Sequence, residues 1–397
     1  MTSDLFAPDE LWPDDLPPMA LTDGLVDAVK KALSADIDGK SSVCESLHAH
    51  PVFSRISNYH LRKGDGGEGP TIEDVADWLL ETAKKSNDVL PAVQRLCDFF
   101  FTNSACAYVA FAVIGIQPQT KVSLTDDIEI MPFHMLPDAN EKRVWIDYWN
   151  AAHYGLPDAG LIMKFNIKPA LCTHESGIGY PPEYYVKLKD VLRCLTLVGP
   201  SSPIAVCRWY GYLDELPFRR TGWIMAHEIA EINPWVSRGV YPFEGDAARN
   251  VIAKYLTLDD KMRGRFRLPI DRLRLAIRRT TPEDSAIDLA IALESSLINE
   301  NDSNYKRSNK MQERASYFLS HVNNNKSLIK NLISVIYDFR STAAHGGTIE
   351  WDLNEGKNPW PQLRDGNNIC AQILVKAIVE GGLPSDWNNY IINNGAN

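Results

Sequence analysis

Hydrophobic residues recur at three- and four-residue spacing in the run that begins near Lys326, at Leu332, Ile336, Phe339 and Ala343. This spacing predicts a helix with one buried face. Gly346 and Gly347 follow the last of these positions. Glycine readily adopts the left-handed conformation of a helix C-terminal cap, so we expect the helix to end there.

Helical spacing recurs elsewhere in the last third of the chain. Thr281-Pro282-Glu283-Asp284 predicts a helix start, because a capping hydroxyl precedes a proline at the first helical position and two acids in the first turn. Two more helices are predicted around residues 305–319 and over 369–380, the latter ended by Gly381-Gly382. Four helices with short or moderate loops predict an up-down bundle.

The middle of the chain has a different pattern. Aromatic and β-branched residues over 105–116 are typical of a buried strand, and further strands are predicted over 122–130, 161–167 and 204–209. Asp126 and Asp127 are expected to form a turn or an edge within the second of these. A helix over 182–198 is expected to pack on the strands.

The N-terminal part is predicted to be helical over 21–33, over 71–85 after a Thr71 cap, and over 90–101. The first 19 residues hold five acids, no base and four prolines, which is typical of a tail. The predicted fold class is α+β, with a mixed α/β region followed by an all-α helical bundle. We expect a tail over 1–20, an α+β domain over 21–260 and a helical domain over 265–397.

Composition narrows the class of protein. The 397 residues are 45% hydrophobic and 23% charged, enough to bury a core, and the net charge of -10 argues against a broadly basic, duplex-binding surface. Seven cysteines without short regular spacing favour reduced thiols. The acidic start lacks a basic leader, and the longest apolar run, 105–116, is too short to cross a bilayer. We therefore expect a soluble, cytoplasmic protein with no membrane partner.

One stretch is strongly basic. Residues 261–279 hold eight basic side chains against Asp271 alone: Lys261, Arg263, Arg265, Arg267, Arg272, Arg274, Arg278 and Arg279. Such a run is commonly a solvated helix face beside a domain junction. It could instead be a track for the phosphate backbone of RNA, with Arg272, Arg274, Arg278 and Arg279 as the contacts.

The end of the predicted helix at Lys326 carries the candidate chemistry. On a helical wheel Arg340 lies at the edge of the buried face, and His345 lies roughly 140° from it, nearly in line with Asp338. A guanidinium can hold a phosphate by two parallel hydrogen bonds. An imidazole can move a proton near neutral pH. The pair is therefore a candidate site for phosphodiester cleavage.

The segment YDFRSTAAHGG, with Arg-x4-His at a helix end, resembles the signature of the HEPN superfamily, most closely its Apea-like branch. The resemblance extends upstream through DLAIALESSL and YKRSNKMQERASYFL. It implies a helical bundle that pairs as a homodimer, with both motifs lining one cleft. It further implies metal-independent cleavage of single-stranded RNA, in a toxin or anti-phage defence role, with Arg340 and His345 as catalytic residues.

Other side chains could support this chemistry. Ser341 could donate a hydrogen bond, Asp338 could orient the imidazole, and Tyr337 could stack on a base or simply pack. Glu294 projects from the middle of a predicted apolar helix face made of Ile287, Ala290, Ile291, Leu297 and Ile298. A carboxylate there needs a cation, and Arg314 and Arg340 are the candidates. Such a pair could fix helix register or orient Arg340.

Two functional hypotheses stay open at this stage. The first is an endoribonuclease whose N-terminal part senses a trigger. The second is a non-catalytic dimer that binds RNA, a nucleotide or a regulatory protein, with His345 as a helix-capping cation. No cofactor or metal is expected, since the spacing of Cys44, His48, His50 and His60 matches no common zinc finger.

Overall fold

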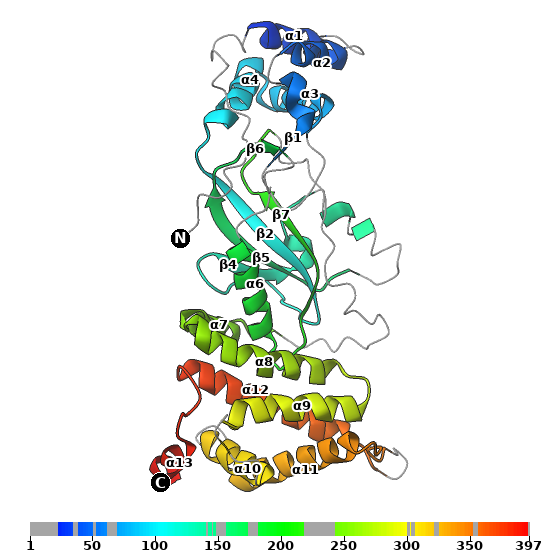
Figure 1. Cartoon of the computed structure of the whole chain (residues 1–397). Coiled ribbons are helices and arrows are strands. Elements are labelled where there is room, and N and C mark those ends of the chain that lie inside the picture. Colours follow the sequence, from blue (N-terminus) through cyan, green and yellow to red (C-terminus); the bar gives the residue numbers. More distant parts are fainter. Residues whose placement is uncertain are drawn as a thin grey trace.

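The computed structural model describes residues 23–34, 39–50, 53–61, 70–139, 142–144, 146–147, 156–173, 182–217, 243–299, 302, 306–320, 325–351 and 356–395. Figure 1 shows an elongated molecule with N-terminal helices at one end, a β-sheet in the middle and the C-terminal helices at the other end. The fold class is α+β with a helical C-terminal region, as predicted from the sequence. The tail predicted for residues 1–20 lies outside the described residues.

The N-terminal level is helical, and its hydrophobic core also includes sheet residues such as Ala107 and Tyr212. Its elements are α1 (Asp23–Ser34), α2 (Gly39–His48), η2 (Phe53–Asn58), α3 (Ile72–Ser86), α4 (Val89–Asp98) and η3 (Phe99–Phe101). The predicted cap at Thr71 is confirmed as a full capping box. The backbone N–H of Asp74 donates to Thr71 Oγ1 at 3.1 Å, and the backbone N–H of Thr71 donates to Asp74 Oδ2 at 2.9 Å.

The middle level is a five-stranded antiparallel sheet in the order β3-β4-β5-β2-β7, beside a two-stranded pair of β1 and β6. The strands are β1 (Tyr59–Leu61), β2 (Ala105–Ile114), β3 (Val122–Ser123), β4 (Ile128–Pro132), β5 (Ala159–Ile167), β6 (Leu171–Thr173) and β7 (Ile204–Tyr212). The stretch predicted as one strand over 122–130 is two, β3 and β4, and the expected turn at Asp126 and Asp127 lies between them.

The central strand β2 is buried on both faces, which explains its unbroken apolar sequence. Val109 and Phe111 face helix α6 (Pro182–Leu195), where the ring of Phe111 lies 5.7 Å from that of Tyr185. Tyr108 and Ala110 face the other side, where they pack with residues around the short helix η4 (Phe133–Met135). The sheet is therefore a middle layer with side chains packed on both faces.

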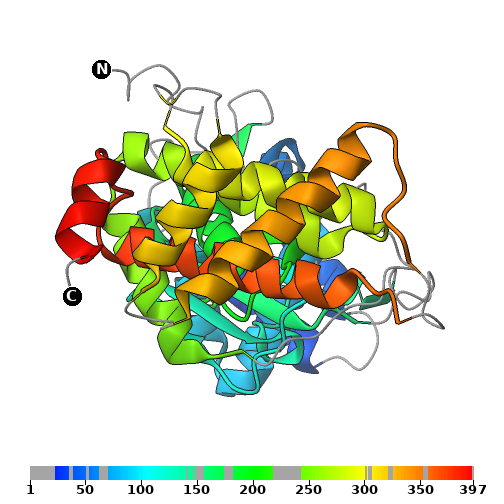
Figure 2. The same ribbon diagram turned by 90° about the horizontal axis from the view of Figure 1, so that it is seen from below.

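The C-terminal level consists of α7 (Gly245–Thr257), α8 (Asp260–Arg278), α9 (Pro282–Leu297), α10 (Arg307–Phe318), α11 (Lys326–Ala344), α12 (Trp360–Val379) and α13 (Trp387–Gly395). The predicted start at Thr281 is confirmed, with Pro282 in the first turn. The helix predicted over 369–380 begins earlier, at Trp360. Seen from below in Figure 2, α10 and α11 form the outer layer and cross over α9 and α12.

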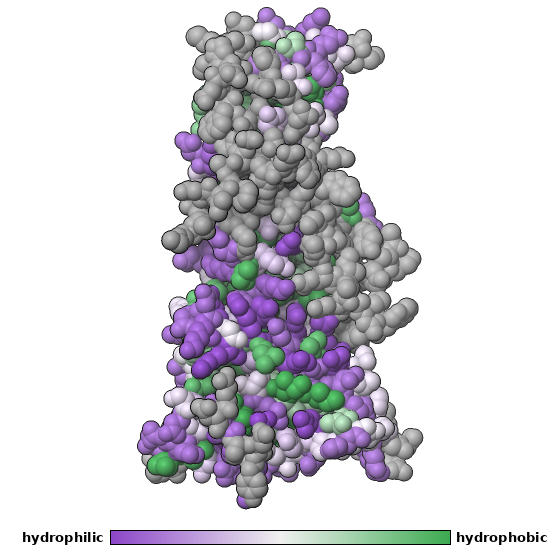
Figure 3. All heavy atoms as spheres, viewed as in Figure 1, coloured by the Kyte–Doolittle hydropathy of each residue, from purple (hydrophilic) through white to green (hydrophobic). Residues whose placement is uncertain are grey.

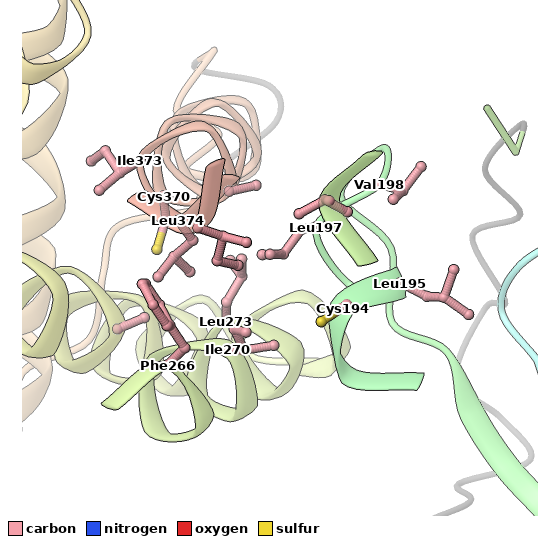
Figure 4. Packing of buried hydrophobic residues seen from close by; sticks show 14 of the residues in the cluster. Cys194, Leu195, Leu197, Val198, Phe266, Ile270, Leu273, Cys370, Ile373 and Leu374 are labelled. Atoms are coloured by element: carbon pink, nitrogen blue, oxygen red, sulfur yellow. The ribbon is translucent and has the colours of Figure 1, made fainter. Parts of the chain in front are cut away.

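One hydrophobic core runs without a break from the sheet into the C-terminal helices. Figure 4 shows Cys194 and Leu197, at the end of α6, facing Ile270 and Leu273 of α8, with Leu374 of α12 on the same side. All of these side chains are buried. Helix α8 is therefore shared, because it packs on α6 of the sheet level and on α9 and α12 of the bundle.

The surface in Figure 3 is mostly hydrophilic at the level of α7 and α8, and hydrophobic side chains gather at the level of α9. The exposed large apolar side chains of the C-terminal helical region include Leu268, Leu328, Trp351 and Ile392. Within the described ranges, no helix is both long enough and apolar enough to cross a membrane.

Candidate functional site

Helix α11 carries the Arg-x4-His segment at its C-terminal end. Asn325 caps its first turn through a hydrogen bond from the backbone N–H of Leu328 to Asn325 Oδ1, at 3.0 Å. A buried stripe of Ile329, Ile333 and Ile336 holds the helix on the bundle. The predicted glycine stop is confirmed, since Gly346 has a φ of 77°. The two candidate residues therefore lie at the exposed tip of an outer helix.

Arg340 is half-buried, and its guanidinium carbon lies 5.6 Å from the ring centre of Tyr337, one turn earlier on the helix. In the described ranges no carboxylate forms an ion pair with Arg340. The face of an aromatic ring attracts a guanidinium through its positive charge, and this contact does not use the guanidinium N–H groups as hydrogen-bond donors. The guanidinium donors of Arg340 are thus available to an anion.

His345 occupies the C-terminal cap position of α11 and is exposed. Its backbone N–H donates to the carbonyl of Ser341 at 3.2 Å, which fixes the residue at the end of the helix. Its imidazole has no hydrogen-bond partner among the described residues. This position at the C-terminal end of the helix is compatible with the capping role expected as an alternative.

Arg340 and His345 are not brought together within one chain. The two positions differ by about 140° around the helix axis. Arg340 continues the line of the buried stripe, whereas His345 and the exposed Asp338 lie on the opposite side. Ser341 and Tyr337 are half-buried between these two sides, and Tyr337 packs against the core. Each half of the candidate pair therefore faces a different direction.

The prediction that Glu294 pairs with Arg314 or Arg340 is wrong. Arg314 instead holds Asp302, with Nη1–Oδ2 and Nη2–Oδ1 distances of 2.5 and 2.8 Å, and donates to the carbonyl of Leu297 at 2.7 Å. The hydrogen bonds from Arg314 lower the pKa of Asp302 to about 2. Arg314 is buried, and its guanidinium carbon lies 5.5 Å from the ring centre of Trp387. It ties the end of α9 to α10 and α13 and is not near an open site.

The reason lies in which face α9 buries. Its deepest side chains are on the side of Leu289, Leu293 and Leu297, which contacts α8, α11 and α12. The stripe of Ile287, Ile291, Glu294 and Ile298 is the half-exposed side. Water reaches Glu294 there, and among the described residues it has no ion-pair partner and needs none.

The basic run predicted as an RNA track is helix α8, and two of its four proposed contacts share one buried acid. Arg272 Nη1 and Arg279 Nε lie 2.8 and 2.7 Å from the two oxygens of Asp288, which is 2% exposed. The hydrogen bond to Asp288 raises the pKa of Arg279. Both arginines keep N–H groups outside this pair, because each donates through one nitrogen only.

A second buried acid, Asp190, pairs with another arginine of α8. Asp190 of α6 accepts from Arg193 Nη1 at 2.7 Å and from Arg267 Nη2 at 2.9 Å. Arg193 also reaches Asp271 at 3.0 Å. The basic run is thus partly a set of ion pairs between the sheet level and the bundle. Arg274 and Arg278 are half-buried and have interactions of their own.

Asp190 and Asp288 are the residues that sequence reasoning missed. Neither aspartate stands out in the sequence around it. Only the arginine-rich composition of α8 could have indicated that buried acids lie on neighbouring helices. A helix with so many arginines that also carries a core face needs acids on the helices packed against it.

Comparison with known proteins returned nothing that matches this chain: no family model, no curated protein and no solved structure. The functional argument therefore depends on the residues themselves.

Proposed function

We propose that the protein is a metal-independent endoribonuclease that cleaves single-stranded RNA with Arg340 and His345, acting as a cytoplasmic homodimer in a toxin or anti-phage defence role. The resemblance of the α11 segment to the HEPN signature supports this proposal. The basic α8 supports it as a region where RNA phosphates could be held beside the remaining N–H groups of Arg272 and Arg279, and beside Arg274 and Arg278.

The observation that carries the proposal is that Arg340, near the exposed end of α11, has no carboxylate partner among the described residues. Arg272 and Arg314 each hold a carboxylate, whereas Arg340 pairs with none in the described ranges. An arginine on the outer helix whose N–H donors have no acid partner suits phosphate binding. An exposed imidazole five residues later supplies the proton-transfer group that such chemistry needs.

In this proposal His345 accepts the proton of a ribose 2′-hydroxyl, and the resulting oxygen attacks the neighbouring phosphorus. Arg340 stabilises the charge that develops on the phosphate oxygens. The bond from phosphorus to the 5′-oxygen breaks, and that oxygen takes up a proton. The products are a 2′,3′-cyclic phosphate and a 5′-hydroxyl, and no metal takes part.

A second copy would complete the site, because Arg340 and His345 of one chain face different directions. Helix α11 has a further apolar stripe at heptad spacing, made of Leu328, Leu332, Val335 and Phe339. Leu328 is 55% exposed, and the other three are half-buried. Parallel pairing of two α11 helices along this stripe would cover it and bring two Arg-x4-His segments side by side.

The test is cleavage of a labelled single-stranded RNA in EDTA by the wild type, Arg340→Ala and His345→Ala. Lys30→Ala is the control, because Lys30 is an exposed basic residue of the N-terminal helix α1 with no partner among the described residues. We expect cyclic-phosphate ends from the wild type and the control only, with losses of about 100-fold or more in the other two variants. Equal cleavage by all four proteins would place the activity elsewhere.

A second candidate is a non-catalytic dimer that binds RNA, a nucleotide or a regulatory protein. The divergence of Arg340 and His345 within one chain favours it. RNA binding without cleavage, weakened by Arg340→Ala but not by His345→Ala, would support this function over the ribonuclease.

A further inference from the structure

The C-terminal part of α11 extends past the point where the helix is buried in the bundle. The buried stripe of the helix ends at Ile336, and none of the side chains over 337–348 is fully buried. A helix end with few buried contacts opens readily, because little packing opposes the loss of order. The part of α11 that carries Arg340 and His345 therefore needs a fixed point beyond its own end.

That fixed point is Ile349, four residues after His345. Its side chain is 4% exposed and belongs to the hydrophobic core of the bundle. Its backbone N–H donates to Glu283 Oε1 at 2.8 Å. Among the described residues, this is the one hydrogen bond that joins residues 346–351 to another helix. Glu283 therefore holds the chain just after the end of α11.

Glu283 is itself held in place at the start of α9. It lies in the first turn, where the backbone N–H of Asp284 donates to Thr281 Oγ1 at 3.3 Å. The buried Ser285 donates through its hydroxyl to the carbonyl of Ala276 at 2.9 Å, which joins the start of α9 to α8. Figure 1 shows the start of α9 and the end of α11 at the same end of the bundle. The acceptor of the Ile349 N–H is thus fixed to the core of the bundle.

The short segment between His345 and Ile349 has little freedom. The backbone N–H groups of Gly346 and Gly347 donate to carbonyls in the last turn of α11, at 3.2 and 3.0 Å. These two bonds form a Schellman motif, which the left-handed conformation of Gly346 permits. A single residue separates Gly347 from Ile349. A displacement of Ile349 would therefore move the closed turn and His345 with it.

We propose that Glu283 is a positioning residue for His345 and acts through Ile349. This inference rests on the proposed function, since it assigns Glu283 a part in the ribonuclease reaction. Glu283 does not touch the RNA; it restricts the motion of the helix end. Proton transfer requires the imidazole within about 3 Å of the 2′-hydroxyl. A misplacement of about 1 Å can lower a rate by about 100-fold, so a fixed helix end matters for the chemical step.

The test compares the RNA cleavage kinetics of Glu283→Ala, Glu283→Gln and Asp284→Ala with those of the wild type. Glu283→Ala removes the acceptor of the Ile349 N–H. Its kcat should fall about 10-fold or more, and its KM should change less than about twofold, because Arg340 still binds the phosphate. Glu283→Gln retains a side-chain oxygen as acceptor and should keep kcat within about threefold of the wild type.

Asp284→Ala is the matched control. It removes the neighbouring acid of the same first turn, which accepts from Thr281 Oγ1 at 2.9 Å, and leaves the bond to Ile349 intact. Its kcat and KM should equal those of the wild type. Amide hydrogen exchange measures the anchor directly: the Ile349 amide should exchange faster in Glu283→Ala and stay protected in the other two variants.

The outcomes separate this inference from the ribonuclease itself. Equal kcat in the wild type and Glu283→Ala would overturn the inference and leave the proposed function intact. The inference is also overturned if Asp284→Ala loses as much activity as Glu283→Ala, or if Glu283→Gln does not restore it, because weakening of α9 would then explain the loss. A wild type that cleaves no RNA would overturn the proposed function and the role of Glu283 with it.

Discussion

A β-carbon on Gly366 would lie 2.3 Å from Cδ1 of Ile336 and 2.8 Å from Cδ2 of Leu289. Helix α12 therefore approaches α11 and α9 more closely than any larger residue at position 366 would allow. This contact lies one turn before Arg340 on α11, so it helps to set the position of the candidate site.

Replacing Gly366 by alanine should lower the free energy of unfolding by about 1–3 kcal/mol, because the added methyl group overpacks a buried helix crossing. Gly264→Ala is the control, since a β-carbon at Gly264 in α8 would meet nothing within 4 Å. There the gain in helix propensity should raise the free energy of unfolding by about 0.5–1 kcal/mol. Urea denaturation measures both. A loss in both variants would mean that helix propensity does not decide the outcome at position 264.

Removal of the carboxylate shared by Arg272 and Arg279 should destabilise the folded protein. Asp288→Ala leaves two arginines without their buried partner, so we expect a loss of about 3 kcal/mol in the free energy of unfolding. Asp246→Ala is the control, because Asp246 is 95% exposed in its pair with Arg249 and should contribute less than about 1 kcal/mol. Equal losses would show that burial of Asp288 does not determine the strength of its pairs.

The Arg314–Asp302 pair predicts a dependence of stability on acid. The pKa of Asp302 is about 2 in the folded protein, below the ordinary aspartate value of 3.8, and the hydrogen bonds from Arg314 are the largest cause. The pair therefore contributes fully above pH 4, and its contribution is lost as the pH falls from about 4 to about 2. Asp302→Asn should lower the thermal midpoint at pH 7 and flatten its fall between those pH values. Parallel curves for the two proteins would contradict the assigned pair.

The apolar stripe on α11 predicts how the chain associates. Val335→Glu should convert a dimer into a monomer, because a carboxylate would be buried in the paired stripe. Light scattering measures the mass, and the RNA cleavage assay shows whether activity depends on pairing. Asn331→Glu on the exposed side of the same helix is the control. A wild-type monomer, or a Val335→Glu dimer, would remove α11 as the dimer interface.

Local signals along the chain predicted the local structure well. Thr71 and Thr281 cap helices as their residue types indicate, and the apolar run beginning at Ala105 is the central strand. Gly346 ends α11 with a positive φ. Each of these outcomes depends on residues within a few positions of one another, so the sequence alone contains the information.

Pairings between distant elements could not be predicted in the same way. The helical wheel of α9 has apolar residues on two sides, and only packing against α8 and α12 decides that the side of Leu289 is buried and the side of Glu294 is not. Likewise, Arg314 could have reached several acids. Its partner Asp302 lies five residues after the end of α9, and nothing in the local sequence singles it out.

The sharing of α8 between two levels determines where the chain can be divided. A fragment that starts at the predicted boundary, residue 265, would cut α8 and leave Ile270 and Leu273 without the side chains at the end of α6 that face them. Such a fragment would expose apolar surface and tend to aggregate. A fragment that keeps this cover should therefore begin before Pro182, so that it includes α6. In the intact chain, heat should melt the sheet and the bundle in a single cooperative transition.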